Sequence, residues 1–527
     1  MAILNSSIEK DLWDAADLLR TNSRLKSSEY ATPVLGLIFL KYADFRFACA
    51  KQRTDKEYAE AGKRRKPNKT DYQAQGIMYL PETARYEYLL NLPEDRDIRE
   101  AVIQAIKDVE EENPLLKDVI LKQPFKRIPK DILVSLLKKF NSIEMKETNG
   151  DTFGAIYEYF LGKFALAEGQ KGGEFFTPNS LVRLIVEIVE PHHGMILDPA
   201  CGSGGMFVQS AKFVNQHNGD SGSDISIYGQ ENIADTVRLC KMNLAVHGFE
   251  GDVKLSNTYY ENIHGCYQKM NYVLANPPFN AKGVDKKRIR ENDPRYPFGM
   301  PSTDNANYLW IQEFYSAMKP GEGKAGFVMA NSAADARGVE QEIRKQIIQK
   351  NAIDVMISIG PNFFYTVTLP CTLWFFDNHK TNHTRKDSIL FIDARTIFTQ
   401  VDRAHREFSA KQIEYIANIV RLYHNKDVET TEGSETFLKE NGFQKGRKFQ
   451  YQDVPGLCKI ATLAEVEAQG WSLNPGRYVG TQVEEFDEDD FWEKFSTLNS
   501  ELQQLNKESK KLEKVIEENF VALGGMS

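Results

Sequence analysis

The fold of this chain is decided by the stretch Met195-Ile196-Leu197-Asp198-Pro199-Ala200-Cys201-Gly202-Ser203-Gly204-Gly205. An apolar run, an acid and a glycine-rich turn in this order predict a buried strand that runs through a tight turn into a helix. The turn, with Ser203 between Gly202 and Gly204, lets the backbone approach a ligand closely and directs helix amide groups toward it. Its spacing differs from the GxGxxG pattern that binds pyrophosphate. We therefore expect a ligand without phosphate, with Asp198 facing a positively charged amino acid group such as that of S-adenosylmethionine.

Short apolar runs alternate with helical stretches after this turn, which is typical of a parallel α/β sheet. We predict one doubly wound, Rossmann-like domain with seven strands, and an additional strand at Ile389–Asp393. The seven are Met195–Asp198, Ile225–Glu231, Asp252–Asn257, Tyr272–Asn276, Lys324–Asn331, Asp354–Ile359 and Cys371–Asp377.

The regions on either side of this domain have a different pattern. Residues 1–150 are predicted to form a helical domain, with apolar residues at helical spacing between Ile8 and Leu19 and a second helix over Thr32–Phe47 opened by Pro33. We assign 151–410 to the catalytic domain, 411–486 to a mixed extension and 487–527 to a charged helical tail. The tail has a partly heptad-like apolar seam. We expect this seam to pack against another helix, either from this chain or from another subunit. The seam is Leu498, Leu502, Leu505, Leu512 and Ile516.

Length and composition describe a folded protein of two or three domains, with 527 residues and 41% hydrophobic residues. No membrane-spanning run and no secretion signal are evident, so we expect a cytoplasmic protein. The six cysteines lack ligand spacing, which argues against a zinc site and a disulfide framework. The net charge of −8 is unusual for a DNA-binding protein, but Lys51–Lys69 and Lys282–Arg290 are basic clusters. Each is either a solvated loop or a nucleic-acid contact.

Two further strand ends carry candidate ligand-binding side chains. Glu231 closes the second strand, where an acid commonly accepts ribose hydroxyl groups; the alternative is a local helix-capping role. Asn257 follows the third strand, where the edge of an adenine ring would need a polar partner. Both residues would complete a donor pocket beside the glycine turn.

The most specific motif is Asn276-Pro277-Pro278-Phe279, at the end of an apolar run. The prolines remove two backbone donors and stiffen the turn, which leaves carbonyl groups and the Asn276 side-chain oxygen as acceptors. Two converging acceptors can hold an exocyclic amine and direct its lone pair toward a methyl donor. Phe279 would stack on the base, which has to be extracted from the duplex.

Taken together, these segments resemble the amino-group methyltransferases of DNA. The segment 172–178, with Glu174, Phe175, Phe176 and Thr177, looks like the family's donor-binding motif, and the motif order resembles that of the gamma group, which methylates adenine N6. The helical start, Asn307-Tyr308-Leu309-Trp310 and Trp471-Ser472-Leu473-Asn474-Pro475-Gly476-Arg477-Tyr478 resemble the modification subunit of type I restriction-modification systems, the HsdM family.

This resemblance implies a DNA adenine-N6 methyltransferase that uses S-adenosylmethionine and acts on a flipped base. Its expected partners are DNA, a separate specificity subunit that binds two modification subunits, and optionally a restriction subunit. No recognisable target-recognition segment remains after the regions are assigned, which favours borrowed sequence specificity. Three other functions stay open: a protein-glutamine methyltransferase, a cytosine-N4 methyltransferase and a non-catalytic DNA-binding scaffold.

Overall fold

A computed structural model of the chain describes residues 27–62, 65–73, 78–142, 177–218, 225–302, 305–364, 369–403, 405–480 and 488–522. The chain divides into two units, Met1–Val479 and Gly480–Ser527. The helix predicted near residues 8–19 lies outside the described residues, as do Glu174, Phe175 and Phe176.

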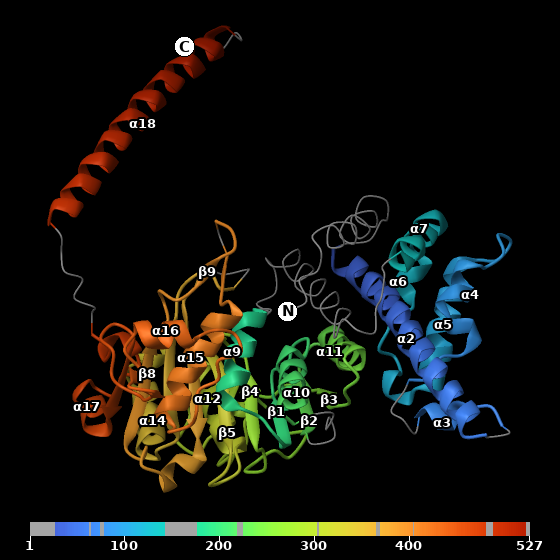
Figure 1. Cartoon of the computed structure of the whole chain (residues 1–527), viewed down its shortest axis with the longest axis horizontal. Coiled ribbons are helices and arrows are strands. Elements are labelled where there is room, and N and C mark those ends of the chain that lie inside the picture. Colours follow the sequence, from blue (N-terminus) through green and yellow to red (C-terminus); the bar gives the residue numbers. More distant parts are fainter. Residues whose placement is uncertain are drawn as a thin grey trace. The chain divides into compact units, whose positions relative to one another are not determined.

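The centre of the first unit is a nine-stranded sheet in the order β3-β2-β1-β4-β5-β7-β6-β8-β13 (Figure 1). Its strands are β1 (Gly194–Asp198), β2 (Ile225–Glu231), β3 (Asp252–Leu255), β4 (Tyr272–Ala275), β5 (Lys324–Ala330), β6 (Ile353–Ile359), β7 (Cys371–Asp377), β8 (Ser388–Asp393) and β13 (Cys458–Thr462). The strand β7 is antiparallel to β5 and β6, and β13 is antiparallel to β8. The other pairs are parallel. The seven predicted strands and the additional one are confirmed, and β13 extends the sheet beyond them.

Both faces of this sheet are buried, which explains its nearly continuous apolar strands. Ile196 of β1 belongs to the core on one face, with the helices α9 (Asn179–Val189), α10 (Gly205–Asn218) and α15 (Ala410–Tyr423). Leu197, the next residue, belongs to the core on the other face, with α12 (Asn307–Ala317) and α14 (Val339–Gln349). The remaining helices of this part are α11 (Ala234–Val246), α13 (Asn331–Ala334), α16 (Glu435–Glu440) and α17 (Leu463–Ala468).

The N-terminal region is helical, as predicted. Its described helices are α2 (Ser27–Glu60), α3 (Lys69–Gln73), α4 (Tyr86–Leu90), α5 (Ile98–Glu112), α6 (Gln123–Lys126) and α7 (Lys130–Asn141). The helix α2 is longer than the predicted Thr32–Phe47, and it contains Pro33 rather than beginning there. A proline inside a helix removes one backbone hydrogen bond and crowds the carbonyl four residues before it, so α2 includes Pro33 against the local preference. The first part of the basic cluster, Lys51–Glu60, is therefore helical.

Residues 411–479 pack onto the catalytic core. The helix α15 begins with a capping box formed by Ser409 and Gln412, and its buried residues join the core around α9. Farther along, the ring of Tyr478 stacks on Phe391 of β8 at a centroid distance of 3.9 Å. The described part of the 411–486 extension thus supplies an edge strand, a covering helix and an aromatic contact to the same domain.

The second unit contains a long helix, α18 (Glu488–Ala522). Its seam residues Leu502, Leu505, Leu512 and Ile516 are between 57% and 64% exposed. Within the described parts of the chain, no helix is long and apolar enough to cross a membrane.

Candidate active site

The site forms at the carboxyl ends of β1, β2, β3 and β4. The strand order reverses between β1 and β4, because the chain passes from β1 to β2 and β3 on one side and returns to β4 on the other. Ligands of doubly wound sheets bind in the crevice at such a reversal. Asp198, Glu231, Asn257 and Asn276 all lie at these strand ends.

The glycine turn after β1 depends on two left-handed glycines, with φ of +50° at Gly202 and +82° at Gly204. A Cβ at Gly204 would lie 2.8 Å from Sγ of Cys240 in α11, so the turn packs against that helix without room for a side chain. Asn243, also in α11, donates from Nδ2 to the Ser203 carbonyl oxygen at 2.8 Å. The turn is therefore fixed by α11 as well as by its own sequence.

Two carboxylates lie beside this turn. Asp198 is only 2% exposed, and burial raises its pKa well above the usual range; the neighbouring Glu231 raises it further, and the Ala200 N–H opposes both effects. Burial also raises the pKa of Glu231, opposed by backbone hydrogen bonds. One of these comes from the Gly202 N–H to Oε2 at 3.1 Å. A cationic ligand would relieve the cost of keeping two neighbouring buried carboxylates ionised.

The residues after β3 lie beside the glycine turn and its two carboxylates. The Asn257 side-chain oxygen accepts from the Tyr259 N–H at 3.1 Å, so it shapes the local turn. The hydroxyl of Thr258 donates to the Pro199 carbonyl oxygen at 2.5 Å, which joins this turn to the glycine turn. The structure thus brings the turn that contains Asn257 next to the turn that follows Asp198. The hydrogen bond of Thr258, which the sequence pattern did not single out, connects the two turns.

Asn276 follows directly after β4, and its Nδ2 donates to Oγ1 of Thr177 at 2.8 Å. The two residues are separated by 99 positions in the chain. Pro277 is buried, and the ring of Phe279 meets Phe364 edge-on at 5.7 Å. Of the predicted donor-binding segment, Thr177 is therefore in direct contact with the predicted catalytic motif.

A long loop follows the motif and carries the second basic cluster. Arg295 anchors it, because its guanidinium is buried and donates to Asp293 and to the Thr258 carbonyl oxygen. Arg288 lies over the ring of Tyr260 at 4.0 Å. The side chains of Lys287 and Arg290 are exposed. The predicted basic cluster is thus an anchored loop with cations on its surface.

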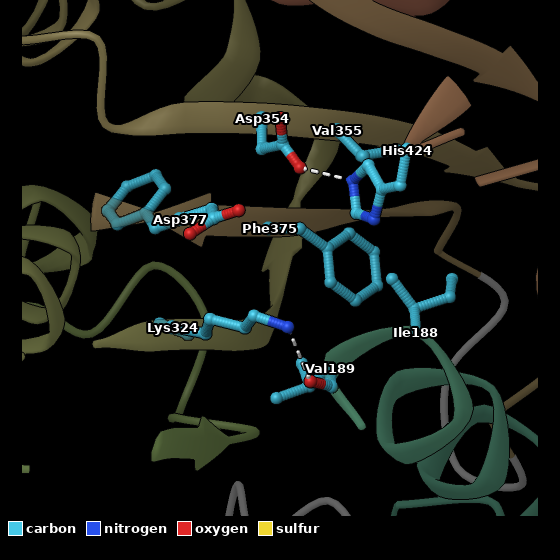
Figure 2. A pocket seen from close by; sticks show the side chains of 10 residues that line it. Ile188, Val189, Lys324, Asp354, Val355, Phe375, Asp377 and His424 are labelled. Carbon is cyan, nitrogen blue, oxygen red and sulfur yellow. Dashed lines mark hydrogen bonds and ion pairs between the residues drawn. The ribbon is translucent and has the colours of Figure 1, made fainter. Parts of the chain in front are cut away.

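A small cavity lies at the opposite end of the sheet, where β5 begins (Figure 2). Lys324 there donates to the Val189 carbonyl oxygen at 3.3 Å, and His424 pairs with Asp354 at 2.7 Å. The interior of about 10 Å³ has room for about one water molecule. Charged side chains therefore line this cavity inside the core, and it is too small to hold a substrate.

Three positions in this region were not identified as functional from sequence: Thr258, Asn243 and the side-chain role of Asn307. Their signal is weak, because each is a single polar residue that the local sequence pattern does not distinguish from its neighbours. Asn243 and Asn307 are nevertheless buried, at 1% and 0% exposure, and hydrogen-bonded to the two loops of the site.

Residues 148–487 match the family described as N-6 DNA methylase, and residues 8–140 match the HsdM N-terminal domain. The chain belongs to the N-6 DNA methylase family. It is 36% identical to the type I restriction enzyme MjaIX methylase subunit of Methanocaldococcus jannaschii, over 99% of this chain and 92% of that protein. It is 34% identical to the HindI methylase subunit of Haemophilus influenzae, over 81% of this chain and 93% of that protein.

Solved structures agree with this N-6 DNA methylase assignment at the level of the fold. The type I methyltransferase subunit from Streptococcus thermophilus superposes with a TM-score of 0.71 at 22% identity, covering 90% of this chain and 99% of that one. The predicted membership among type I modification subunits and the predicted methyltransferase fold are confirmed. As a member of this family, the enzyme uses S-adenosylmethionine as methyl donor.

Proposed function

We propose that this protein transfers a methyl group to N6 of an adenine flipped out of duplex DNA, as the modification subunit of a type I complex. The observation that carries the proposal is the Asn276 amide at the end of β4. Its nitrogen donates to Oγ1 of Thr177 at 2.8 Å, so the amide is held at the end of the strand beside the proposed donor-binding segment.

The target amine needs acceptors, because it carries two hydrogens and must keep its lone pair directed at the methyl carbon. We assign one acceptor to Oδ1 of Asn276 and the other to the carbonyl oxygen of Pro277. Catalysis would then rest mainly on positioning and on charge stabilisation, with no covalent enzyme intermediate. The ring of Phe279 is assigned to stacking on the flipped base, whose extraction costs about a few kcal/mol. Pro278 keeps the turn rigid.

The donor pocket is assigned to the opposite wall. When bound, S-adenosylmethionine supplies an electrophilic methyl group on a cationic sulfur. Its positively charged ammonium group suits the buried carboxylate of Asp198, and its ribose hydroxyl groups can donate to the carboxylate of Glu231. We assign Asp198 to the amino acid part of the donor, Glu231 to the ribose and Asn257 to the adenine. The remaining assigned contacts are Gly202, Ser203, Gly204, Thr177 and, outside the described residues, Glu174, Phe175 and Phe176.

DNA is supported as the substrate by the basic loop that follows the motif. The exposed cations Lys287 and Arg290 lie on a loop that begins directly after the catalytic tetrapeptide. Such cations bind phosphates without reading sequence. A protein-glutamine methyltransferase has no need of this basic loop.

Sequence specificity is assigned to a separate subunit, with two copies of this chain for each specificity subunit and a restriction subunit as an optional third component. The exposed apolar seam of α18 supports such a contact, because leucines that are more than half exposed usually have a partner helix. Replacing Leu505 and Leu512 by glutamate should abolish co-purification with the specificity subunit. Glutamate at Lys507 and Lys510, on the same helix but outside the seam, is the matched control. Unchanged co-purification of the seam variant would exclude α18 as the contact.

The function is tested by methylation with tritiated S-adenosylmethionine, using the complex with its specificity subunit and either DNA or protein as acceptor. We expect label in DNA, and mass spectrometry of the digested nucleosides should find N6-methyladenine. N4-methylcytosine, label in protein, or donor binding without any transfer would each support one of the three other functions instead. The isolated chain should bind the donor and methylate poorly.

A further inference from the structure

The loop of residues 281–306 leaves the catalytic motif and returns to the same point. At its base, the Ala306 N–H donates to the Ala281 carbonyl oxygen at 3.1 Å. Next to this bond, Asn280 and Asn307 form a reciprocal pair. The Asn280 backbone N–H donates to Oδ1 of Asn307 at 2.8 Å, and Nδ2 of Asn307 donates to Oδ1 of Asn280 at 2.9 Å. The two ends of the loop are therefore joined by three hydrogen bonds.

Asn307 is suited to fix the position of its partner. It is the first residue of α12 and fully buried, and both polar atoms of its side chain bond Asn280. Its helix is anchored independently, because Tyr308, Ile311 and Phe314 lie in the core beneath the sheet. A buried amide that loses such a partner is left with unpaired polar atoms, which is unfavourable, so the pair has a defined geometry.

Asn280 in turn is linked closely to the catalytic motif. It follows Phe279 and has a left-handed backbone with φ of +53°. The hydroxyl of Ser332, in α13, also donates to its Oδ1 at 3.3 Å. Between Asn280 and Asn276 the chain contains two prolines, whose φ angles are fixed. A shift at Asn280 is therefore transmitted to Asn276 with few soft dihedral angles to absorb it.

We propose that Asn307 is a positioning residue for methyl transfer: through Asn280 it fixes the catalytic tetrapeptide against the end of α12. This proposal rests on the proposed function, because it concerns the geometry of the same tetrapeptide. A displacement of about 1 Å at a reacting group can cost about 100-fold in rate, so loss of the amide pair should slow the chemical step.

Three substitutions test the hydrogen bonds between Asn280 and Asn307 separately. Asn307→Asp retains the acceptor for the Asn280 N–H but puts a carboxylate oxygen against Oδ1 of Asn280. Asn280→Gly retains the left-handed backbone and removes the acceptor. Asn280→Asp retains both, because its Oδ1 still accepts from Asn307 and aspartate tolerates this conformation.

The experiment measures single-turnover methylation by the assembled complex at saturating DNA and donor. Asn307→Asp and Asn280→Gly should lower the rate about 10- to 100-fold with donor affinity unchanged, and Asn280→Asp should stay near wild type. In the isolated chain, hydrogen exchange of peptides covering residues 274–282 should be faster in the first two variants only.

Two outcomes overturn the proposal: a wild-type rate for Asn307→Asp, or a parallel loss of donor affinity and thermal stability that accounts for the whole decrease. The variant Asn276→Ala in the same series separates the two levels of inference. If it is inactive while Asn307→Asp is fully active, only the positioning role fails. If Asn276→Ala methylates adenine normally, the proposed function fails as well.

Discussion

Gly204 offers the sharpest test of the donor pocket, because its replacement by alanine has two separable costs. Its φ of +82° is a conformation that costs an L-residue about 1–2 kcal/mol. The added Cβ would also lie 2.8 Å from Sγ of Cys240, closer than real contacts permit. Overpacking of this kind costs about 1–3 kcal/mol more.

The turn can relieve this strain by moving away from α11, and that movement would deform the proposed donor pocket. If about 2 kcal/mol of this cost is added to the free energy of donor binding, the donor affinity falls about 30-fold, because about 1.4 kcal/mol corresponds to a factor of ten. We expect at least this loss for Gly204→Ala when S-adenosylmethionine binding is measured by titration calorimetry. In a Cys240→Ala background the overlap disappears, so the loss should shrink to the backbone cost of about 1–2 kcal/mol, which is about 5- to 30-fold.

Gly321→Ala is the matched control, because Gly321 has φ of +73° and open space around its Cβ position. It should lower the Tm by a few degrees, at about 2–4 °C per kcal/mol, and leave donor affinity unchanged. The reasoning is refuted if Gly204→Ala binds the donor as wild type does. It is also refuted if the loss is the same with and without Cys240.

Three other predictions concern the target side and stability. Thr177→Val should lower kcat about tenfold because the Asn276 amide loses its partner, whereas Thr177→Ser should retain activity; equal rates for both variants would contradict this orienting role. Burial raises the pKa of Glu313 to about 7, so the stability it contributes is present below its ordinary pKa of 4.5 and lost as the pH rises toward 7. The increase in Tm caused by Glu313→Gln should therefore grow from about pH 5 to pH 8. An increase in Tm that does not change with pH would count against a raised pKa of Glu313. Replacing Lys287 and Arg290 by glutamine should weaken DNA binding and reduce its salt dependence by about two charges, and an unchanged salt slope would exclude the loop from the phosphate contact.

Local sequence pattern predicted most of the catalytic sheet, because its strands are buried on both faces and appear as short apolar runs. The strand β13 was missed since its residues are only partly buried and it pairs with β8 across a long intervening segment. The glycine turn and the Asn-Pro-Pro-Phe motif were found because their residue types are demanded by local geometry.

The supporting contacts could not be predicted in the same way. The pairs Asn243–Ser203 and Asn307–Asn280 join residues that are 40 and 27 positions apart. An asparagine side chain gives no periodic signal and suits a turn, a helix cap or a buried hydrogen bond equally well. Only the packing of α11 and α12 against the two loops selects one of these roles.

The central claim is that the Asn276 side chain accepts a hydrogen bond from the adenine amine. Its most direct measurement is the N6-methyladenine content of target DNA after incubation with the complex carrying Asn276→Ala, with Asn91→Ala in the N-terminal region as the control. We predict that methylation by Asn276→Ala falls by at least about 100-fold while donor binding and complex assembly persist. Wild-type levels of N6-methyladenine from Asn276→Ala would contradict the account.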